Sequence, residues 1–439
     1  MLDQLDDNQK RALDMMAEPS SPNVFVAWWA MGTGKTRLAL AAFYLSDYKD
    51  CIIVCRRISF EDWMDEMETI GFNNANCYTN DYQPTNLVKL SCHKNPKRIL
   101  FLSAGDLKNI PIYFPKGQML IVDELYLFCN AQAKRSILLR QMSLFCSARI
   151  GLSGTIMPSR DNTAIFGQLA ALNAHHPLAS GTTEFRLRFQ VKSKTKYGIS
   201  YVNKPNSDQA INALISDRVD CYFPESRPTR IQLCKLDKTK EQELAIKELK
   251  ETYNHKDKSY KYALQIVHAI NGISNGWFVN SDNNLEYYKS SKLEKLFSLV
   301  DDIVAGGHRV VVWCAYHADI SRIAKDLKHP WLEFSGTTPF SSVEWQSGKF
   351  SVVLATEAMG ASVNHFKHVK YAVYYSINYK YLDLQQSMAR HERKGSQHDG
   401  AHYYFLQTRG TMDARAYQLV SDSRSTEEEI IKILANESW

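Results

Sequence analysis

The sequence lacks any apolar run long enough to cross a bilayer, and its acidic N-terminus lacks a signal-peptide pattern. Its nine cysteines include no C-x-x-C pair, and no histidine has partners at the spacing of metal ligands. These absences argue against a membrane protein and against a zinc site. They predict a cytoplasmic protein with reduced thiols and no membrane partner.

The length and net charge of the chain limit its number of domains and its possible partners only broadly. With 439 residues, of which 44% are hydrophobic and 23% charged, the chain is long enough for two or three domains that each bury a core. The formal net charge of +6 is small for this length. It permits a polyanionic partner such as nucleic acid, but an ordinary solvated surface gives the same number.

The most informative stretch is residues 29–36, which read Trp-Ala-Met-Gly-Thr-Gly-Lys-Thr between two apolar runs. The pattern predicts a buried strand, a glycine-rich turn and a helix that opens at or just after Lys35. Glycines let backbone N–H groups surround an anion, and a helix start adds partial positive charge. Lys35 can then reach the terminal phosphates of a nucleotide, and the Thr36 hydroxyl can hold Mg²⁺. Trp29 stands where the strict phosphate-loop pattern has its first glycine, so an ordinary glycine turn is the alternative.

Upstream of this loop, residues 5–9 lead into apolar positions at helical spacing, which predicts a capped amphipathic helix. Because Gln9 precedes a phosphate loop, its amide is a candidate to bond the two edges of an adenine. A solvated helix residue is the alternative. The residues predicted to bind the nucleotide in this half are Gln9, Met31, Gly32, Thr33, Gly34, Lys35 and Thr36.

Two adjacent carboxylates, Asp123 and Glu124, follow four apolar residues at 119–122. We expect Asp123 to hold Mg²⁺ through its waters and Glu124 to polarise the attacking water. Two unpaired carboxylates at the end of a buried strand are costly unless a metal or ligand compensates them. An acidic turn at the strand end is the alternative.

Short apolar runs predict further buried parallel strands. They lie at residues 24–28, 51–55, 99–103, 119–122, 150–153, 309–313, 351–356 and 371–375. Because these runs alternate with helical stretches, the sequence predicts an α/β fold with one doubly wound parallel sheet in each half. Between the halves lies a polar helical stretch, followed by an amphipathic helix at 290–305. We expect a first domain at 1–222, a connecting helical segment at 223–290 that belongs to or leads into the second domain, and that domain at 291–439.

Polar residues follow several predicted strands, and the carboxyl ends of parallel strands line a ligand crevice. Arg56 and Arg57 come directly after the run at 51–55, where they could meet a phosphodiester backbone or be solvated loop charges. Ser153 and Thr155 could link the nucleotide site to a second ligand or only make a turn.

Two arginines in the C-terminal half, Arg390 and Arg393, are predicted to lie one helical turn apart and to project from one face. Guanidiniums from a separate domain suit a split nucleotide site, because they close on the γ-phosphate and neutralise transition-state charge. A solvated basic helix face is the alternative.

Together these segments resemble the motifs of superfamily-two helicases, and among them of the Swi/Snf-like double-stranded DNA translocases. The matching positions, in chain order, are residues 31–36, Trp63 and Glu66, residues 123–126, residues 152–155, Phe185 and Phe189 with Tyr197 and Gly198, then Thr356, Gly360 and Asn364, and finally Gln386, Arg390, Arg393 and Gly395. Leu125 and Tyr126 replace the usual Ala-His, and Ser362 replaces a usual glycine. The resemblance spans almost the whole chain in the expected order.

The resemblance implies two RecA-like domains with ATP in the cleft between them. Lys35, Asp123 and Glu124 would act from the first domain, Arg390 and Arg393 from the second, and Gly360 and Gln386 would belong to the nucleotide site. Sequence-independent contacts to duplex or branched DNA are implied for Arg56, Arg57, Ser103, Thr155, Thr356 and Asn364.

The implied activity is that of an ATP-dependent motor that moves along or remodels DNA or displaces bound proteins. A strand-separating DNA or RNA helicase is one alternative, although no wedge can be identified by sequence. A nucleotide-gated nucleic-acid-binding scaffold with slow turnover is the other.

Overall fold

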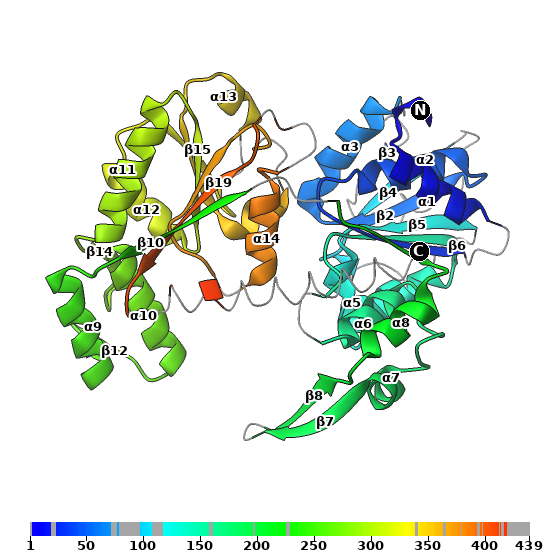
Figure 1. Cartoon of the computed structure of the whole chain (residues 1–439), viewed down its shortest axis with the longest axis horizontal. Helices are drawn as coiled ribbons and strands as arrows, with labels where there is room; N and C mark the ends of the chain where they lie inside the picture. Colours follow the sequence, from blue (N-terminus) through cyan, green and yellow to red (C-terminus); the bar gives the residue numbers. More distant parts are fainter. Residues whose placement is uncertain are drawn as a thin grey trace. The chain divides into compact units, whose positions relative to one another are not determined.

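The computed structural model describes residues 2–18, 23–71, 77–78, 97–107, 117–157, 161–195, 198–224, 229–338, 341–362, 366–378, 380–392, 396, 398–411, 413 and 417–418. The chain divides into two compact units, Met1–Pro224 and Glu225–Arg424 (Figure 1). No helix in the described ranges combines the length and the apolar character that crossing a membrane requires.

The described residues of the first unit form a seven-stranded sheet with the order β3-β4-β2-β5-β6-β1-β9, in which all neighbours are parallel. Its strands are β1 (Val24–Trp29), β2 (Asp50–Cys55), β3 (Cys77–Tyr78), β4 (Arg98–Ser103), β5 (Gln118–Val122), β6 (Cys146–Ser153) and β9 (Val219–Tyr222). Every residue of β1, β4 and β5 is buried. Helices cover both faces of a parallel sheet, and its strands therefore read as continuous apolar runs. The strands expected from these runs are confirmed.

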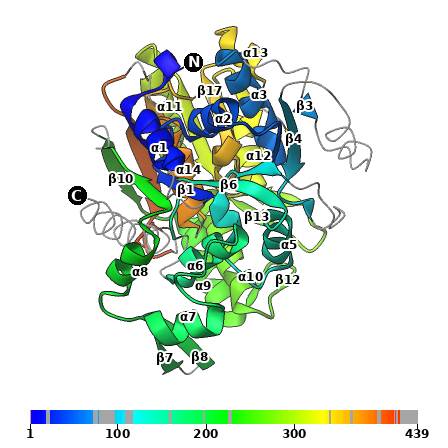
Figure 2. The same ribbon diagram turned by 90° about the vertical axis from the view of Figure 1, so that its right-hand side faces the viewer.

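Two apolar clusters hold helices on the two faces of this sheet (Figures 1 and 2). One face carries α1 (Asp7–Ala17), α2 (Lys35–Leu45) and α3 (Phe60–Thr69), and the other carries α5 (Lys134–Ser143), α6 (Thr163–Ala171), α7 (Thr182–Phe189) and α8 (Ser207–Ile215). Successive residues of β1 point to opposite faces, so that Phe25 and Ala27 pack under the first group and Val24 and Val26 under the second. The doubly wound arrangement is confirmed.

A two-stranded antiparallel hairpin, β7 (Gln190–Thr195) and β8 (Gly198–Asn203), follows α7. It is not part of the seven-stranded sheet and extends away from it beyond the helices (Figure 1). No apolar run in the sequence indicates this element.

The second unit contains a six-stranded parallel sheet with the order β10-β19-β18-β15-β17-β16. Its strands are β10 (Arg230–Leu236), β15 (Val310–Cys314), β16 (Trp331–Phe334), β17 (Val352–Thr356), β18 (Tyr371–Tyr374) and β19 (His402–Thr408). The helices α11 (Ser291–Ala305) and α12 (His317–Asp326) pack on one face, and α13 (Ser342–Gln346) and α14 (Tyr381–Ala389) on the other. The amphipathic helix expected at 290–305 is confirmed as α11.

The stretch expected to be a helical connector begins instead with β10, an edge strand of the second sheet, and lies within the second unit. After β10 come α9 (Lys240–Thr252) and α10 (Ala263–Asn275), with the short pairs β11 (Asn254–His255) and β12 (Lys258–Ser259), and β13 (Trp277–Val279) and β14 (Leu285–Tyr287). A small apolar cluster that includes Leu249, Ile273 and Phe278 holds these elements together.

Candidate nucleotide site

The predicted strand, turn and helix are present, because β1 ends at Trp29 and α2 begins at Lys35. Gly32 and Gly34 have φ values of 75° and 85°, in the left-handed region that suits glycine. A Cβ on Gly34 would also lie 2.4 Å from the amide nitrogen of Gln9. The left-handed φ therefore favours glycine at this position, and a Cβ here would also displace the Gln9 amide from its place beside the loop.

The Lys35 ammonium lies over this turn and donates to the carbonyls of Trp29 and Ala30, both at 2.9 Å. The Thr33 hydroxyl also donates to Ala30, at 2.7 Å. A Cβ on Gly154 would lie 3.6 Å from Lys35 Nζ. The small-residue turn after β6 therefore approaches the loop closely, and the resemblance to a helicase motif at 152–155 has a structural counterpart here.

Trp29 is fully buried, and its side chain anchors the start of the loop. Its indole N–H donates to Asp220 Oδ2 at 2.7 Å. Asp220, on β9, also accepts two hydrogen bonds from the Arg11 guanidinium, at 2.7 and 2.9 Å. This network fixes the start of the loop at the position where the strict phosphate-loop pattern has a glycine. Sequence reasoning missed it, because Arg11 and Asp220 are 209 positions apart.

Gln9 is 3% exposed and contacts the loop itself. Its Nε2 donates to the Gly34 carbonyl at 3.0 Å, and its Oε1 accepts from the Asp6 backbone N–H at 2.9 Å in the capping box of α1. The capped helix is confirmed. An adenine contact by Gln9 stays a prediction, and it requires these two bonds to open.

The two carboxylates follow β5 directly. Asp123 is half-buried and accepts hydrogen bonds from the Trp63 indole at 3.0 Å and from the Glu124 backbone N–H at 2.9 Å. Burial raises the pKa of Asp123, while the Trp63 hydrogen bond and the positive charge of Lys35 oppose this rise. Glu124 has a φ of 51°, which is strained for a side-chain-bearing residue and is typical of functional sites.

These residues fit a triphosphate with Mg²⁺. Thr36, the second residue of α2, and Asp123 offer the hard oxygen ligands that Mg²⁺ prefers. A divalent cation at Asp123 would offset the cost of burying its charge, and the loop N–H groups would face the phosphates. The group of residues predicted around Lys35 is thus brought together at the carboxyl edge of the first sheet.

Neither a protein-family model nor a curated protein matches the sequence. Among solved structures, the helicase domain of Pyrococcus furiosus Hef aligns with 95% of this chain and 98% of its own, at a TM-score of 0.53 and 12% identity. The chain therefore has the fold of this helicase domain. Its two parallel-sheet units are the two RecA-like domains of that fold, as predicted. The Sulfolobus solfataricus SWI2/SNF2 ATPase core in complex with dsDNA also aligns, with 99% of this chain and 94% of its own, at a TM-score of 0.43 and 16% identity.

Within the first domain of this helicase fold, the residues predicted to contact nucleic acid all follow strands of one sheet. Arg56 is half-buried and donates to the Tyr126 hydroxyl, while Arg57 is exposed and lies 3.3 Å from Asp106. Ser103 and Thr155 are buried at the ends of β4 and β6. Only the arginines therefore present side chains towards solvent, and the nucleic-acid role of all four stays a prediction.

In the second domain, Gly360, Gln386 and Arg390 lie around α14. A Cβ on Gly360 would come within 2.8 Å of the Ser387 backbone, and the Arg390 guanidinium donates to the Gly360 carbonyl. Gln386 and Arg390 are buried, as is Thr356 at the end of β17. Asn364 and Arg393 lie outside the described residues.

α14 ends at Ala389, and Arg390 is its C-cap. Because Arg393 lies outside the described residues, the expectation that the two arginines project from one helix face stays a prediction. The residue after Arg390 turns into the core. His391 is fully buried, with Nδ1 2.9 Å from the Val369 carbonyl and Nε2 accepting from the Trp313 indole at 3.3 Å. This buried ring directly follows the C-cap of α14.

Burial lowers the pKa of His391 to about 4, and this predicts an acid-sensitive second domain. The unfolded chain protonates His391 near its ordinary pKa of about 6.5, so stability falls as the pH drops from about 6.5 towards 4, by about 3 kcal/mol in total. NMR titration of ¹³C-labelled histidine should show His391 neutral down to about pH 4. A midpoint near 6.5 in the folded protein would contradict its burial.

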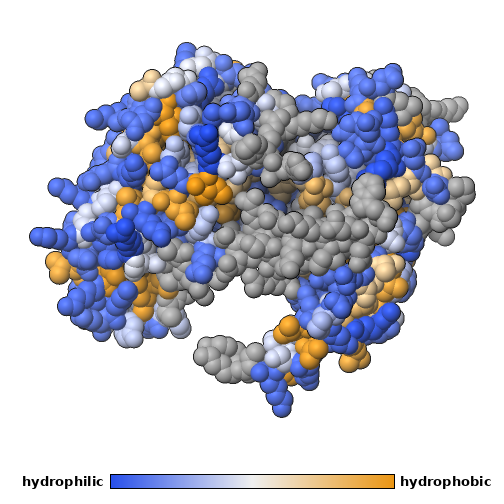
Figure 3. Space-filling view, viewed as in Figure 1, coloured by the Kyte–Doolittle hydropathy of each residue, from blue (hydrophilic) through white to orange (hydrophobic). Residues whose placement is uncertain are grey.

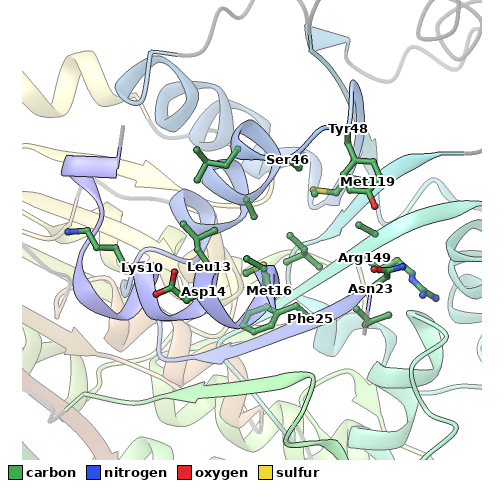
Figure 4. A pocket seen from close by; sticks show the side chains of 16 residues that line it. Lys10, Leu13, Asp14, Met16, Asn23, Phe25, Ser46, Tyr48, Met119 and Arg149 are labelled. Carbon is green, nitrogen blue, oxygen red and sulfur yellow. The ribbon is translucent and has the colours of Figure 1, made fainter. Parts of the chain in front are cut away.

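A pocket of about 680 Å³ lies at the opposite edge of the first sheet, where β1 and β5 begin (Figure 4). Its lining includes Met16, Phe25, Tyr48, Met119 and Arg149. Because the phosphate loop is at the carboxyl edge, this pocket is not part of the nucleotide site.

Proposed function

We propose that this chain is a nucleic-acid-dependent ATPase that uses ATP and Mg²⁺ to move along duplex or branched DNA, in the manner of Swi/Snf-like translocases. The observation that carries the proposal is the meeting of the Lys35 ammonium, the glycine loop and the Asp123 carboxylate at one edge of one sheet. An ordinary glycine turn does not require a half-buried carboxylate such as Asp123 beside a lysine.

The described side chains suit distinct parts of ATP hydrolysis. Lys35 exchanges its bonds to the Trp29 and Ala30 carbonyls for phosphate oxygens, and Glu124 orients and polarises the attacking water. Thr36 and Asp123 would hold Mg²⁺, which would neutralise charge on the phosphates. Trp63 holds Asp123 in place through its indole N–H.

For the partner, we propose DNA bound through its backbone without sequence preference. Arg56 and Arg57 supply charge at the carboxyl edge of the first sheet, where ligands of parallel sheets bind. Binding to the DNA backbone is expected to weaken steeply with salt.

We also propose that the protein lies in the cytoplasm, in keeping with the reduced thiols expected from its sequence.

The test is ATP hydrolysis by the purified chain alone and with duplex DNA, forked DNA, single-stranded DNA or RNA. We expect duplex or forked DNA to stimulate turnover most, and EDTA to abolish it because Mg²⁺ is removed. Displacement of a triplex-forming strand without separation of the duplex would support translocation. Stimulation by RNA alone would favour the RNA helicase, and an absence of hydrolysis under every condition would overturn the proposal.

A further inference from the structure

One projection of the first domain carries a local excess of positive charge. Residues 182–204, here called the basic arm, comprise α7, the hairpin β7–β8 and Lys204. They hold six lysines and arginines against a single acid, Glu184, in a chain whose net charge is +6. The arm stands away from the sheet in Figure 1, and its surface mixes hydrophilic with hydrophobic side chains in Figure 3.

The pairing of the hairpin gathers cationic and aromatic side chains on one face. Lys192 pairs with Tyr201 and Lys194 with Ile199, so these four side chains lie on the same side of the ribbon. From α7, the Arg186 guanidinium stacks on the Tyr201 ring at 4.4 Å from its centroid. The face therefore combines three cations with an aromatic ring.

The charges on this face lack compensation in the described part of the chain. Lys192 and Lys194 are exposed and pair with no described carboxylate, and Arg186 Nε has no hydrogen-bond acceptor there. Glu184, the one acid of the arm, is bonded to Ser180. By contrast, Lys204 donates to the carbonyls of residues 187 and 188 and so satisfies hydrogen-bond acceptors at the C-terminal end of α7.

A buried amide network fixes the base of the arm. Gln190 Nε2 lies within hydrogen-bond distance of Asp161 (2.5 Å) and Asn162 (3.0 Å), just before α6, and of Asn203 (3.2 Å), at the end of β8. An isolated two-stranded hairpin is marginally stable in water, so this anchor sets its position.

The same helix α6 connects the arm to the nucleotide site. Gln168 accepts from the Trp28 indole at 3.1 Å, on the strand that enters the phosphate loop. It also donates to the Ile156 carbonyl at 2.6 Å, just beyond the turn that approaches Lys35. Hydrogen bonds at α6 and at its start therefore join the base of the arm to both segments beside the phosphate loop.

We propose that the basic arm is a further nucleic-acid contact, in which Lys192, Lys194 and the Arg186–Tyr201 stack bind the phosphodiester backbone. The inference rests on the proposed function, because the polymer is the one on which the ATPase acts. Two residues along a strand rise about 6.7 Å, a separation from which two long lysine side chains on one face can both reach phosphates of one strand. Backbone contacts of this kind are independent of sequence.

The experiment compares the full-length chain with the double variant Lys192→Gln, Lys194→Gln. Binding of a fluorescent DNA duplex is measured by anisotropy across a range of salt concentrations. Each lost phosphate contact removes about 0.9 from the slope of log affinity against log salt, so we expect the slope to fall by about 1.8. Affinity in 0.1 M salt should fall by at least about tenfold.

The matched control is Lys247→Gln, Lys250→Gln, which removes the same charge from exposed positions of α9 in the other domain. This control should keep the wild-type slope. The charge-reversed pair Lys192→Glu, Lys194→Glu should bind more weakly than the glutamine pair, and circular dichroism verifies that each variant is folded.

The outcomes separate the two proposals. If the wild-type chain binds no nucleic acid, the proposed function itself fails. If wild type binds and the glutamine pair keeps both affinity and slope, only the role of the basic arm is overturned. Binding of polyglutamate is measured in the same way. If the glutamine pair loses a polyglutamate binding that wild type shows but keeps duplex binding, the proposal is likewise overturned, in favour of an acidic protein partner.

Discussion

Replacing Glu124 with glutamine is expected to slow ATP hydrolysis by about 10²–10⁴-fold while ATP still binds. Glutamine has the size of glutamate but does not accept a proton from water. The substitution leaves the Asp123 contacts to Trp63 and Lys35 in place, because the Glu124 backbone N–H that bonds Asp123 remains. The left-handed backbone at this position is the same for both side chains.

The companion variant Lys35→Met separates binding from chemistry. It removes the ammonium that lies over the loop but keeps the length of the side chain, so we expect both ATP affinity and turnover to be lost. Fluorescent ATP-analogue binding and single-turnover phosphate release measure the two effects, with and without duplex DNA. Wild-type hydrolysis by either folded variant would defeat the assignment of this site.

Much of the first domain was predictable, because its chemistry is local in sequence. The apolar runs that became β1, β2, β4 and β5 are buried on both faces, so composition alone marks them. The two left-handed glycines and Lys35 lie within four positions of one another, and the carboxylates come directly after β5. This part of the site was predictable because its residues are close together in the sequence.

Features that depend on distant partners were not predictable. The attachment of Trp29 to Asp220 joins β1 to an edge strand nearly two hundred residues later. β10 escaped prediction because it is an edge strand whose first four residues are exposed, so it has no continuous apolar run. Among the described strands, β7 and β8 pair only with each other, and their exposed Lys and Val residues gave no buried pattern.

The C-terminal arginines differ in what the structure describes of them. A spacing of three residues predicts one helix face, but Arg390 is the C-cap of α14 and is followed by the buried His391, while Arg393 lies outside the described residues. Arg390 then bonds to Gly360 on the neighbouring segment, and this contact depends on the close approach of Gly360 to Ser387. The two arginines therefore need separate tests.

We expect Arg393→Ala to lower turnover by about 10³–10⁵-fold with ATP binding and thermal stability unchanged, as for an arginine finger. Arg390→Ala should act differently, because its guanidinium is 5% exposed and bonded to the Gly360 carbonyl. Leaving that carbonyl unpaired in a buried site should destabilise the second domain by about 2 kcal/mol, in addition to any loss of turnover.

Turnover and melting temperature, measured side by side, distinguish these roles. The control Arg409→Ala removes an exposed arginine of the same domain, paired at 3.1 Å with the exposed Asp237, and should change neither quantity appreciably. Unchanged turnover in Arg393→Ala would remove it from the finger role. A melting temperature of Arg390→Ala equal to that of wild type would instead show that its buried contact contributes nothing to the domain, which leaves its guanidinium available for the phosphate.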